Sequence, residues 1–139
     1  MTLTKKIKDK KVNFEFNKEY IKVLTDKISN NDAVFITNSF KEIHPADAAD
    51  IIEHLNQNDR ESLIKLNEFQ IDPEVFIELN ESVQSEVIRY LSSTSITGIL
   101  KNLESDDAIK ILENVDESEK NSILSELPPK DRFALLEGL

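Results

Sequence analysis

The chain has 139 residues, no cysteine and only two glycines, and its 27 acidic side chains against 17 basic ones give a formal net charge of −10. This length suits one domain, and the lack of cysteine excludes disulfides, thiolate catalysis and cysteine-based zinc sites. The acidic balance disfavours nucleic acid and anionic lipid as partners. No apolar run approaches the ~20 residues that span a bilayer, and the N-terminus does not read as a signal peptide. We therefore expect a soluble, intracellular, mostly helical protein.

The first residues carry a positive charge that the rest of the chain lacks. Residues 1–12 hold five lysines and one aspartate, a sum of +4, so the other 127 residues carry −14. Runs of like charge with little apolar content remain solvated. We expect residues 1–13 to be a flexible basic tail and residues 14–139 to form a single helical domain. The alternative for the tail is a contact with anionic lipid or an acidic neighbour.

The next two segments have the spacing of amphipathic helices. From Phe14 to Ile28, apolar residues return to one face of a helix. Asn30-Asn31-Asp32 then supplies a turn and a cap, and a second helix is expected from Ala33 to Phe40. The sequence shows no strand pattern, which agrees with its two glycines and few alternating runs.

From His44 onward, the sequence divides into segments of about twelve residues, each of which closes on an apolar residue. Further apolar residues stand three and four places before most of these closing residues, so all three share one helical face. The pattern predicts one short helix per segment. The closing residues are Leu55, Leu66, Leu79, Leu91, Leu103, Val115, Leu127 and Leu139.

The starts of several segments carry residues that initiate helices. Asp72-Pro73 places an N-cap acceptor before a proline at the first helical position. Asn58 with Glu61, and Asp116 with Glu119, have the spacing of capping boxes. Helices this short are marginal alone, because nucleation is costly. Their apolar stripes must therefore be buried by stacking, which predicts an all-α solenoid of about ten helices, with a globular bundle as the alternative.

One segment and the repeat together resemble a known family. Residues 43–55, Ile-His-Pro-Ala-Asp-Ala-Ala-Asp-Ile-Ile-Glu-His-Leu, are followed by repeats with Asp-Asp-Ala and Leu-Pro-Pro openings. Over about residues 40–139 this is similar to the N-terminal cytoplasmic domain of the MgtE family of magnesium transporters. The resemblance implies a right-handed superhelix of short helices. It also implies that paired cystathionine-β-synthase-type domains, a long helix and a dimeric membrane pore follow, and that Mg²⁺ between these domains holds the closed state.

Acidic residues gather late in the chain. Residues 104–119 hold seven acids and one lysine. Magnesium is a hard ion that keeps several waters and takes one or two carboxylates directly. The resemblance implies metal contact at Glu74 and Asp106, whereas Lys110 stands where the family pattern has another acid. Our candidate metal residues are Glu74, Asp106 and Asp107, with weakly bound Mg²⁺ completed by other domains. The alternative is that these acids are helix caps and a solvated face.

The two histidines have ordinary interpretations. His44 precedes Pro45 and is expected to begin a helix. Asp47, Asp50 and His54 share a helical face that a transition metal could use. We favour the alternative, a polar outer stripe, because no further nitrogen or sulfur ligand lies nearby in the sequence.

Two functions remain open. The first is a regulatory magnesium-sensing module at the cytoplasmic face of the inner membrane. Its partners would be the cystathionine-β-synthase-type domains and pore of the same transporter, as a homodimer and without nucleic acid. The alternative is an acidic helical-repeat scaffold for protein–protein interaction, similar to the middle region of flagellar motor switch proteins, with no metal role. No Gly-x-Ser-x-Gly elbow or nucleophile–base pairing is visible, so we expect no enzymatic activity.

Overall fold

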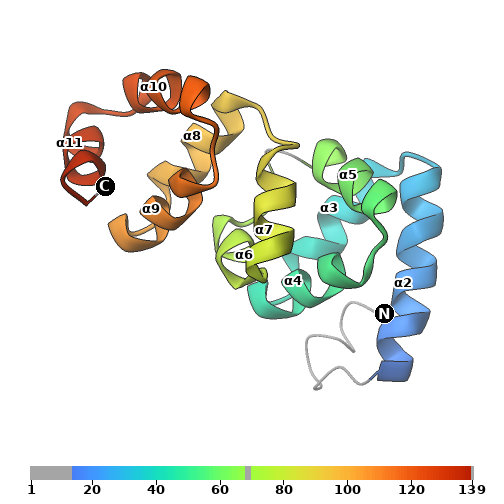
Figure 1. The fold of residues 1–139 in the computed structure, drawn as a ribbon. Coiled ribbons are helices and arrows are strands. Elements are labelled where there is room, and N and C mark those ends of the chain that lie inside the picture. The colour runs from blue at the N-terminus through green and yellow to red at the C-terminus, as the bar shows by residue number, and fades with distance from the viewer. Residues whose placement is uncertain (1–13, 68–69, 139) are drawn as a thin grey trace.

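A computed structural model describes residues 14–67 and 70–138 of the chain. Within these ranges it contains ten helices and no strand, which confirms the predicted all-α class (Figure 1). The tail predicted for residues 1–13 and the closing residue Leu139 lie outside the described residues. The helices are α2 (Phe14–Ser29), α3 (Ala33–Lys41), α4 (Pro45–His54), α5 (Gln57–Leu66), α6 (Pro73–Glu78), α7 (Glu81–Ile88), α8 (Ser93–Lys101), α9 (Ser105–Glu113), α10 (Glu117–Glu126) and α11 (Pro129–Gly138).

The turn between α2 and α3 follows the local sequence. Asn31 has a φ of 55°, in the left-handed region that asparagine tolerates better than most residues. Asp32 then caps α3, because its side chain accepts a hydrogen bond from the backbone N–H of Phe35 at 3.1 Å. Both predicted helices at this end of the chain are therefore confirmed to within a residue or two.

The predicted caps are confirmed in part. Asp72 is the N-cap of α6, and its side chain accepts from the backbone N–H of Glu74 at 2.9 Å. The capping box predicted at Asn58 is wrong, because α5 begins earlier and Asn56 is its N-cap. Asp116 is the N-cap of α10, but its side chain makes no capping hydrogen bond. The helix starts are thus better predicted than the side-chain contacts that accompany them.

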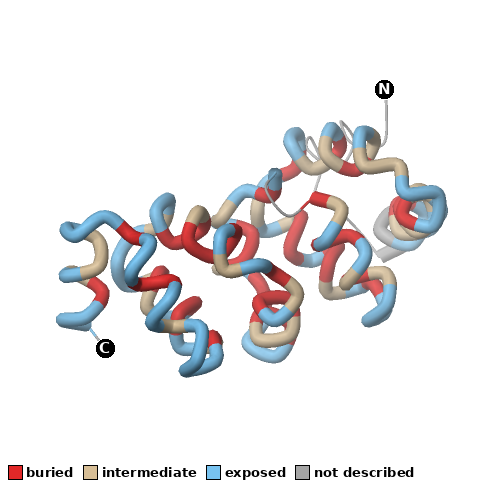
Figure 2. The backbone as a smooth tube through the Cα atoms, turned by 90° about the horizontal axis from the view of Figure 1, so that it is seen from above, coloured by how far each residue is buried: buried red, intermediate tan, exposed pale blue. Residues whose placement is uncertain are grey.

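The helices pack mainly against their second neighbours along the chain. Helix α4 packs on α6, α8 on α10 and α9 on α11. Successive helices thus alternate between two rows, and the molecule is elongated (Figures 1 and 2). This arrangement is compatible with the predicted solenoid, and its right-handed twist remains a prediction. None of the described helices is long and apolar enough to cross a membrane.

The buried residues run along the interior of the stack as one apolar cluster (Figure 2). Most closing residues of the twelve-residue segments belong to it, whereas Leu66 and Leu103 are only half-buried at its margin. On α11, Leu135 is buried but Leu136 and Phe133 are 54% and 64% exposed. No helix in the described ranges packs beyond α11, so its outer apolar residues have no neighbour to cover them.

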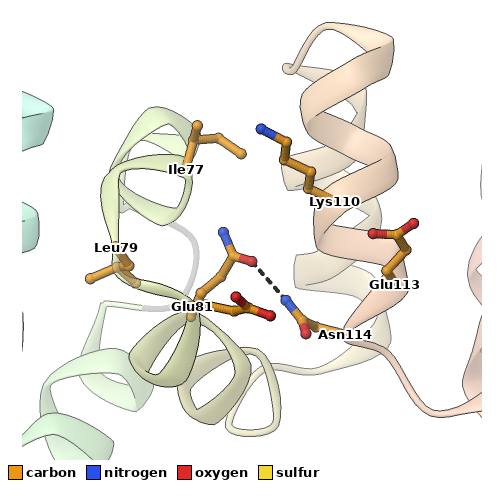
Figure 3. Close-up of a pocket in the computed structure, with 7 residues that line it drawn as sticks. Ile77, Leu79, Glu81, Lys110, Glu113 and Asn114 are labelled. Atoms are coloured by element: carbon orange, nitrogen blue, oxygen red, sulfur yellow. Dashed lines mark hydrogen bonds between the residues drawn. The ribbon is translucent and has the colours of Figure 1, made fainter.

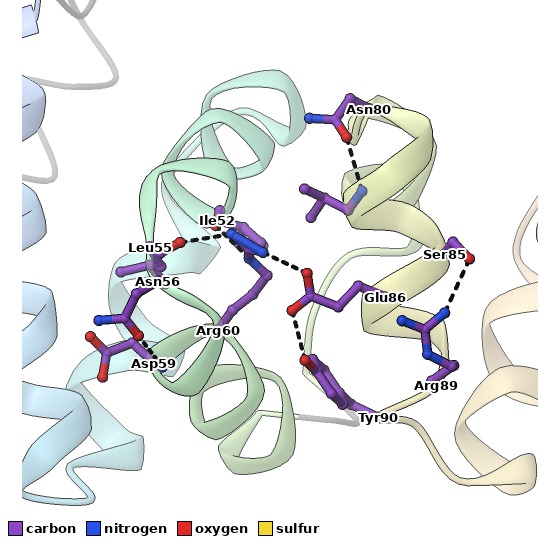
Figure 4. A network of polar contacts seen from close by, with 11 residues as sticks. Ile52, Leu55, Asn56, Asp59, Arg60, Asn80, Ser85, Glu86, Arg89 and Tyr90 are labelled. Atoms are coloured by element: carbon purple, nitrogen blue, oxygen red, sulfur yellow. Dashed lines mark hydrogen bonds and ion pairs between the residues drawn. The ribbon is translucent and has the colours of Figure 1, made fainter.

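One polar network ties α4, α5 and α7 together inside the stack (Figure 4). The buried Arg60 side chain donates to the carbonyl oxygens of Ile52 and Leu55, at 3.2 and 2.7 Å, near the C-terminal end of α4. Its Nη1 also forms an ion pair with Glu86 Oε1 at 2.7 Å. Tyr90 donates to the other oxygen of that carboxylate at 2.7 Å. The network therefore gives the Leu55 carbonyl a buried partner and the Ile52 carbonyl a second donor, since the backbone N–H of Leu55 already donates to Ile52.

Candidate metal site

The first candidate ligand, Glu74, lies in the first turn of α6. Pro73 and the Asp72 cap fix the start of this helix, which places Glu74 at its second position. Its side chain is exposed. A carboxylate at this place is stabilised by the positive end of the helix dipole and remains accessible from solvent.

The other two candidates lie in the first turn of α9. Asp106 is exposed and Asp107 is half-exposed, and the N-cap residue Glu104 makes no side-chain capping bond. Both carboxylates therefore sit beside backbone N–H groups at the positive helix end. This placement gives them a role in helix stability that needs no metal, in line with one of the two sequence interpretations.

The fold brings the helices of the candidate residues together, but it does not assemble a complete ligand set. Helices α6 and α9 pack against each other, so Glu74 and the two aspartates lie on neighbouring helices. Across residues 14–67 and 70–138, no three histidine, aspartate or glutamate side chains cluster closely enough to hold a metal ion. The carboxylate oxygens suit magnesium in kind, and they could supply only part of its coordination.

The possible transition-metal face on α4 also lacks a ligand cluster in the described part of the chain. His44 is the N-cap of this helix, as predicted, although its side chain makes no capping hydrogen bond. Nδ1 of His54 is 2.7 Å from the backbone oxygen of Asp50, so one of its two ring nitrogens is already occupied. The polar-stripe interpretation accounts for what the structure shows here.

Lys110, the residue that departs from the family pattern, borders a hollow that none of the three candidate acids lines. Of the ion pairs between described residues, none joins Lys110 to Asp106, one turn earlier on α9. The lysine side chain instead extends from α9 towards Ile77 on α6 (Figure 3). Its charge thus lies between the two helices that carry the candidate carboxylates.

The hollow has a volume of about 550 Å³ and lies between the end of α6, the start of α7 and the C-terminal part of α9. At its base, the side-chain amide of Asn114 donates to Gln84 Oε1 at 2.7 Å (Figure 3). Sequence reasoning missed this site, because its residues come from segments about thirty positions apart. The residues that line it are Ile77, Leu79, Glu81, Gln84, Lys110, Glu113 and Asn114.

A comparison with protein families matches residues 43–139, well over half of the chain, to the family described as the MgtE intracellular N domain. The chain belongs to this family. The match begins at the residue where the resemblance to MgtE proteins was seen in the sequence and continues through every later repeat. It therefore confirms the family recognised from the sequence.

Comparison with solved structures finds a similar fold. The "soluble part of a magnesium transporter" is similar to this chain with a TM-score of 0.67 and 18% sequence identity. The similarity covers 87% of this MgtE N-domain chain but only 48% of the transporter chain. At this identity the match shows a shared fold. A search of the curated proteins finds no match.

Proposed function

We propose that this chain is the magnesium-sensing intracellular domain of a magnesium transporter. The observation that carries the proposal is the family match over residues 43–139, supported by the shared fold with part of a magnesium transporter. Acidic side chains on the domain hold divalent cations against neighbouring domains. Because the ion neutralises carboxylates that otherwise repel each other, its occupancy controls how the domains sit and whether the channel opens.

The candidate ligands are consistent with a divided site. Glu74 and Asp106 are exposed, and Asp107 is half-exposed, at the starts of two neighbouring helices. The described residues assemble no set of three ligands. A hard cation bound at such a place keeps several waters and takes its remaining ligands from another domain. We therefore expect weak binding of Mg²⁺ to the isolated chain.

The partners follow from the same proposal. The cystathionine-β-synthase-type domains and the pore of the same transporter contact this domain, within a homodimer at the cytoplasmic face of the inner membrane. The chain regulates transport and catalyses no reaction. The support for these partners is the family match and the 48% share of the transporter chain that the fold match covers.

A magnesium titration of the present chain tests the proposal. Millimolar Mg²⁺ should raise its melting temperature, and mass action gives roughly 1.4 kcal/mol of added stability at ten times the dissociation constant. Sodium at matched ionic strength should not reproduce the shift, because screening is not coordination. The double variant Asp106→Asn, Asp107→Asn should reduce the response, and so should Glu74→Gln.

The matched control removes two acids elsewhere. Glu19→Gln with Asp26→Asn changes the net charge by the same amount at two exposed positions of α2. This control should keep the full magnesium response. If sodium gives the same shift and the α6 and α9 variants respond like the parent chain, the local site is refuted.

One observation favours the second candidate function, a scaffold for protein–protein interaction. Phe133 and Leu136 are three positions apart on α11 and more than half exposed, and exposed apolar pairs of this kind occur at contact surfaces. A negative magnesium titration would make the scaffold the leading proposal for the isolated chain.

A further inference from the structure

From α4 onward, second-neighbour helices stack regularly except at one place. Second neighbours pack closely for α4 with α6 and α5 with α7, and again for α8 with α10 and α9 with α11. The two pairs in between, α6 with α8 and α7 with α9, do not pack to this degree. We call α2–α7 the first half, α8–α11 the second half and the boundary between them the seam. In Figure 1 the seam lies between α7 and α9.

Few direct contacts cross the seam. Of the helices in the described ranges, only α6 and α9 pack closely across it. Between described residues of the two halves, there is one hydrogen bond, in which the side-chain amide of Asn114 donates to Gln84 at 2.7 Å. Each half also has side-chain contacts between its own helices. Arg60 pairs with Glu86 in the first half, and Thr97 donates to Glu126 at 3.0 Å in the second.

Hollows lie along the seam on more than one side. The hollow of about 550 Å³ lies between α6–α7 and α9, and a second of about 510 Å³ lies between α7 and Asn114. A third, of about 160 Å³, separates the start of α6 from α8. It is bordered by Gly98, where an added Cβ would meet no atom within 4 Å. All three hollows open to solvent, so the side chains that border them contact water where a closely packed boundary would contact protein.

We propose that the seam is a hinge built into this domain. The two halves move as rigid bodies about the connection at residues 89–92, where the chain passes from α7 to α8. Their motion opens and closes the hollow between α7 and α9. The Gln84–Asn114 hydrogen bond stabilises the closed arrangement of the two halves. Weakly packed boundaries between well-packed units are where hinge motions concentrate.

The hinge has a consequence that rests on the proposed magnesium function. Glu74 belongs to the first half, whereas Asp106 and Asp107 belong to the second. Opening the seam changes the separation of these carboxylates, so the domain's own shape would affect how it presents them to a cation. The hinge itself needs no cation, and its test is therefore run without magnesium.

Distances between spin labels test the hinge in the whole chain. The absence of cysteine means that introduced cysteines label without background. Labels at Glu78 on α6 and Lys130 on α11 report across the seam, and both positions are exposed. Controls within each half pair Lys22 with Glu78, and Thr94 with Lys130, which are also exposed. We expect a broad or two-peaked distance distribution across the seam and narrow distributions within each half.

Variants at the seam should change only the distribution across it. Asn114→Ala removes the hydrogen bond to Gln84. The loss of one hydrogen bond should raise the ratio of open to closed molecules about fivefold, which is seen as a larger share of long distances across the seam. Thr97→Val, the matched control, removes a bond between α8 and α10 inside the second half and should leave the distribution across the seam unchanged. Gly98→Leu places a side chain in the hollow between α6 and α8, and it should narrow the distance distribution across the seam.

A narrow distribution across the seam that Asn114→Ala leaves unchanged would overturn the hinge. This result would say nothing against magnesium binding. Conversely, a failed magnesium titration would leave the distances without magnesium as they are, so the two proposals can fail separately.

Discussion

The surroundings of Glu86 change its pKa. Burial alone would raise its pKa, but hydrogen bonds from Tyr90 and Arg60, together with the charge of Arg60, outweigh burial and hold the pKa below its usual 4.5. Burial and the bond to Glu86 raise the pKa of Tyr90 above 10.0. The fold therefore favours an ionised carboxylate and a neutral phenol at this place.

We predict that Glu86→Gln costs about 1.5–3 kcal/mol at neutral pH, because Arg60 then lacks its counter-charge inside the stack. Since the folded pKa lies below the unfolded one, this stability is fully present above pH 4.5 and is lost as the pH falls through the folded pKa. Urea unfolding of the parent chain and of Glu86→Gln, at neutral and acidic pH, measures the difference between their free energies of unfolding. Glu78→Gln, at an exposed position of α6, is the control and should change little. If the difference in unfolding free energy between the parent chain and Glu86→Gln stayed constant down to strongly acidic pH, the ion pair would be contradicted.

At the scale of single helices, caps define where each short element begins. Asn80 is the N-cap of α7, and its side chain accepts from the backbone N–H of Val83 at 2.9 Å. Its own backbone N–H donates to Glu53 Oε2 at 2.7 Å, which links α7 to α4. The Asn80 side chain therefore gives a partner to one of the backbone donors that the first turn of α7 leaves unpaired.

We predict that Asn80→Ala lowers the free energy of unfolding by about 1 kcal/mol, because one donor at the start of α7 loses its partner. The backbone link to Glu53 should survive, since alanine keeps its N–H. Thermal unfolding followed by circular dichroism measures the change. His44→Ala serves as the control, because His44 is also an N-cap but makes no side-chain capping bond. Equal losses in the two variants would mean that the cap contact of Asn80 carries no stability.

At the scale of the whole molecule, stability depends on helices that cannot stand alone. Each is short and buries one stripe against its neighbours in the stack. Leu112 on α9 is completely buried, whereas Leu136 at the outer side of α11 is 54% exposed. The same residue type thus occupies the interior of the stack and its uncovered end.

We predict that Leu112→Ala costs about 2–5 kcal/mol, through lost apolar burial and a cavity. Leu136→Ala should stay within about 0.5 kcal/mol, because most of that side chain already contacts solvent. Urea unfolding compares the two variants directly. A large loss at Leu136 would show that another surface covers α11 in solution, and a small loss at Leu112 would contradict the stacking arrangement.

The sequence by itself determined the helical class, the twelve-residue period and most helix starts. These features depend on apolar spacing and on capping groups within a few residues, so they are encoded locally. Asp72 before Pro73 is an example, since its cap needs only the next two residues. For the candidate site, local sequence placed Glu74 and Asp106 in first helical turns. Whether they hold magnesium remains a prediction.

Only the tertiary structure decided which segments meet. Arg60 and Glu86 are 26 positions apart, and Gln84 and Asn114 are 30 apart, so no local pattern pairs them. Leu103 fits the period as well as Leu127 does, yet it is half-buried while Leu127 is buried. The period gives each helix an apolar stripe but does not set how closely it packs against its second neighbour. From α4 onward, that closeness is lower at the seam than within either half. The reason is that packing depends on side chains from several segments at once.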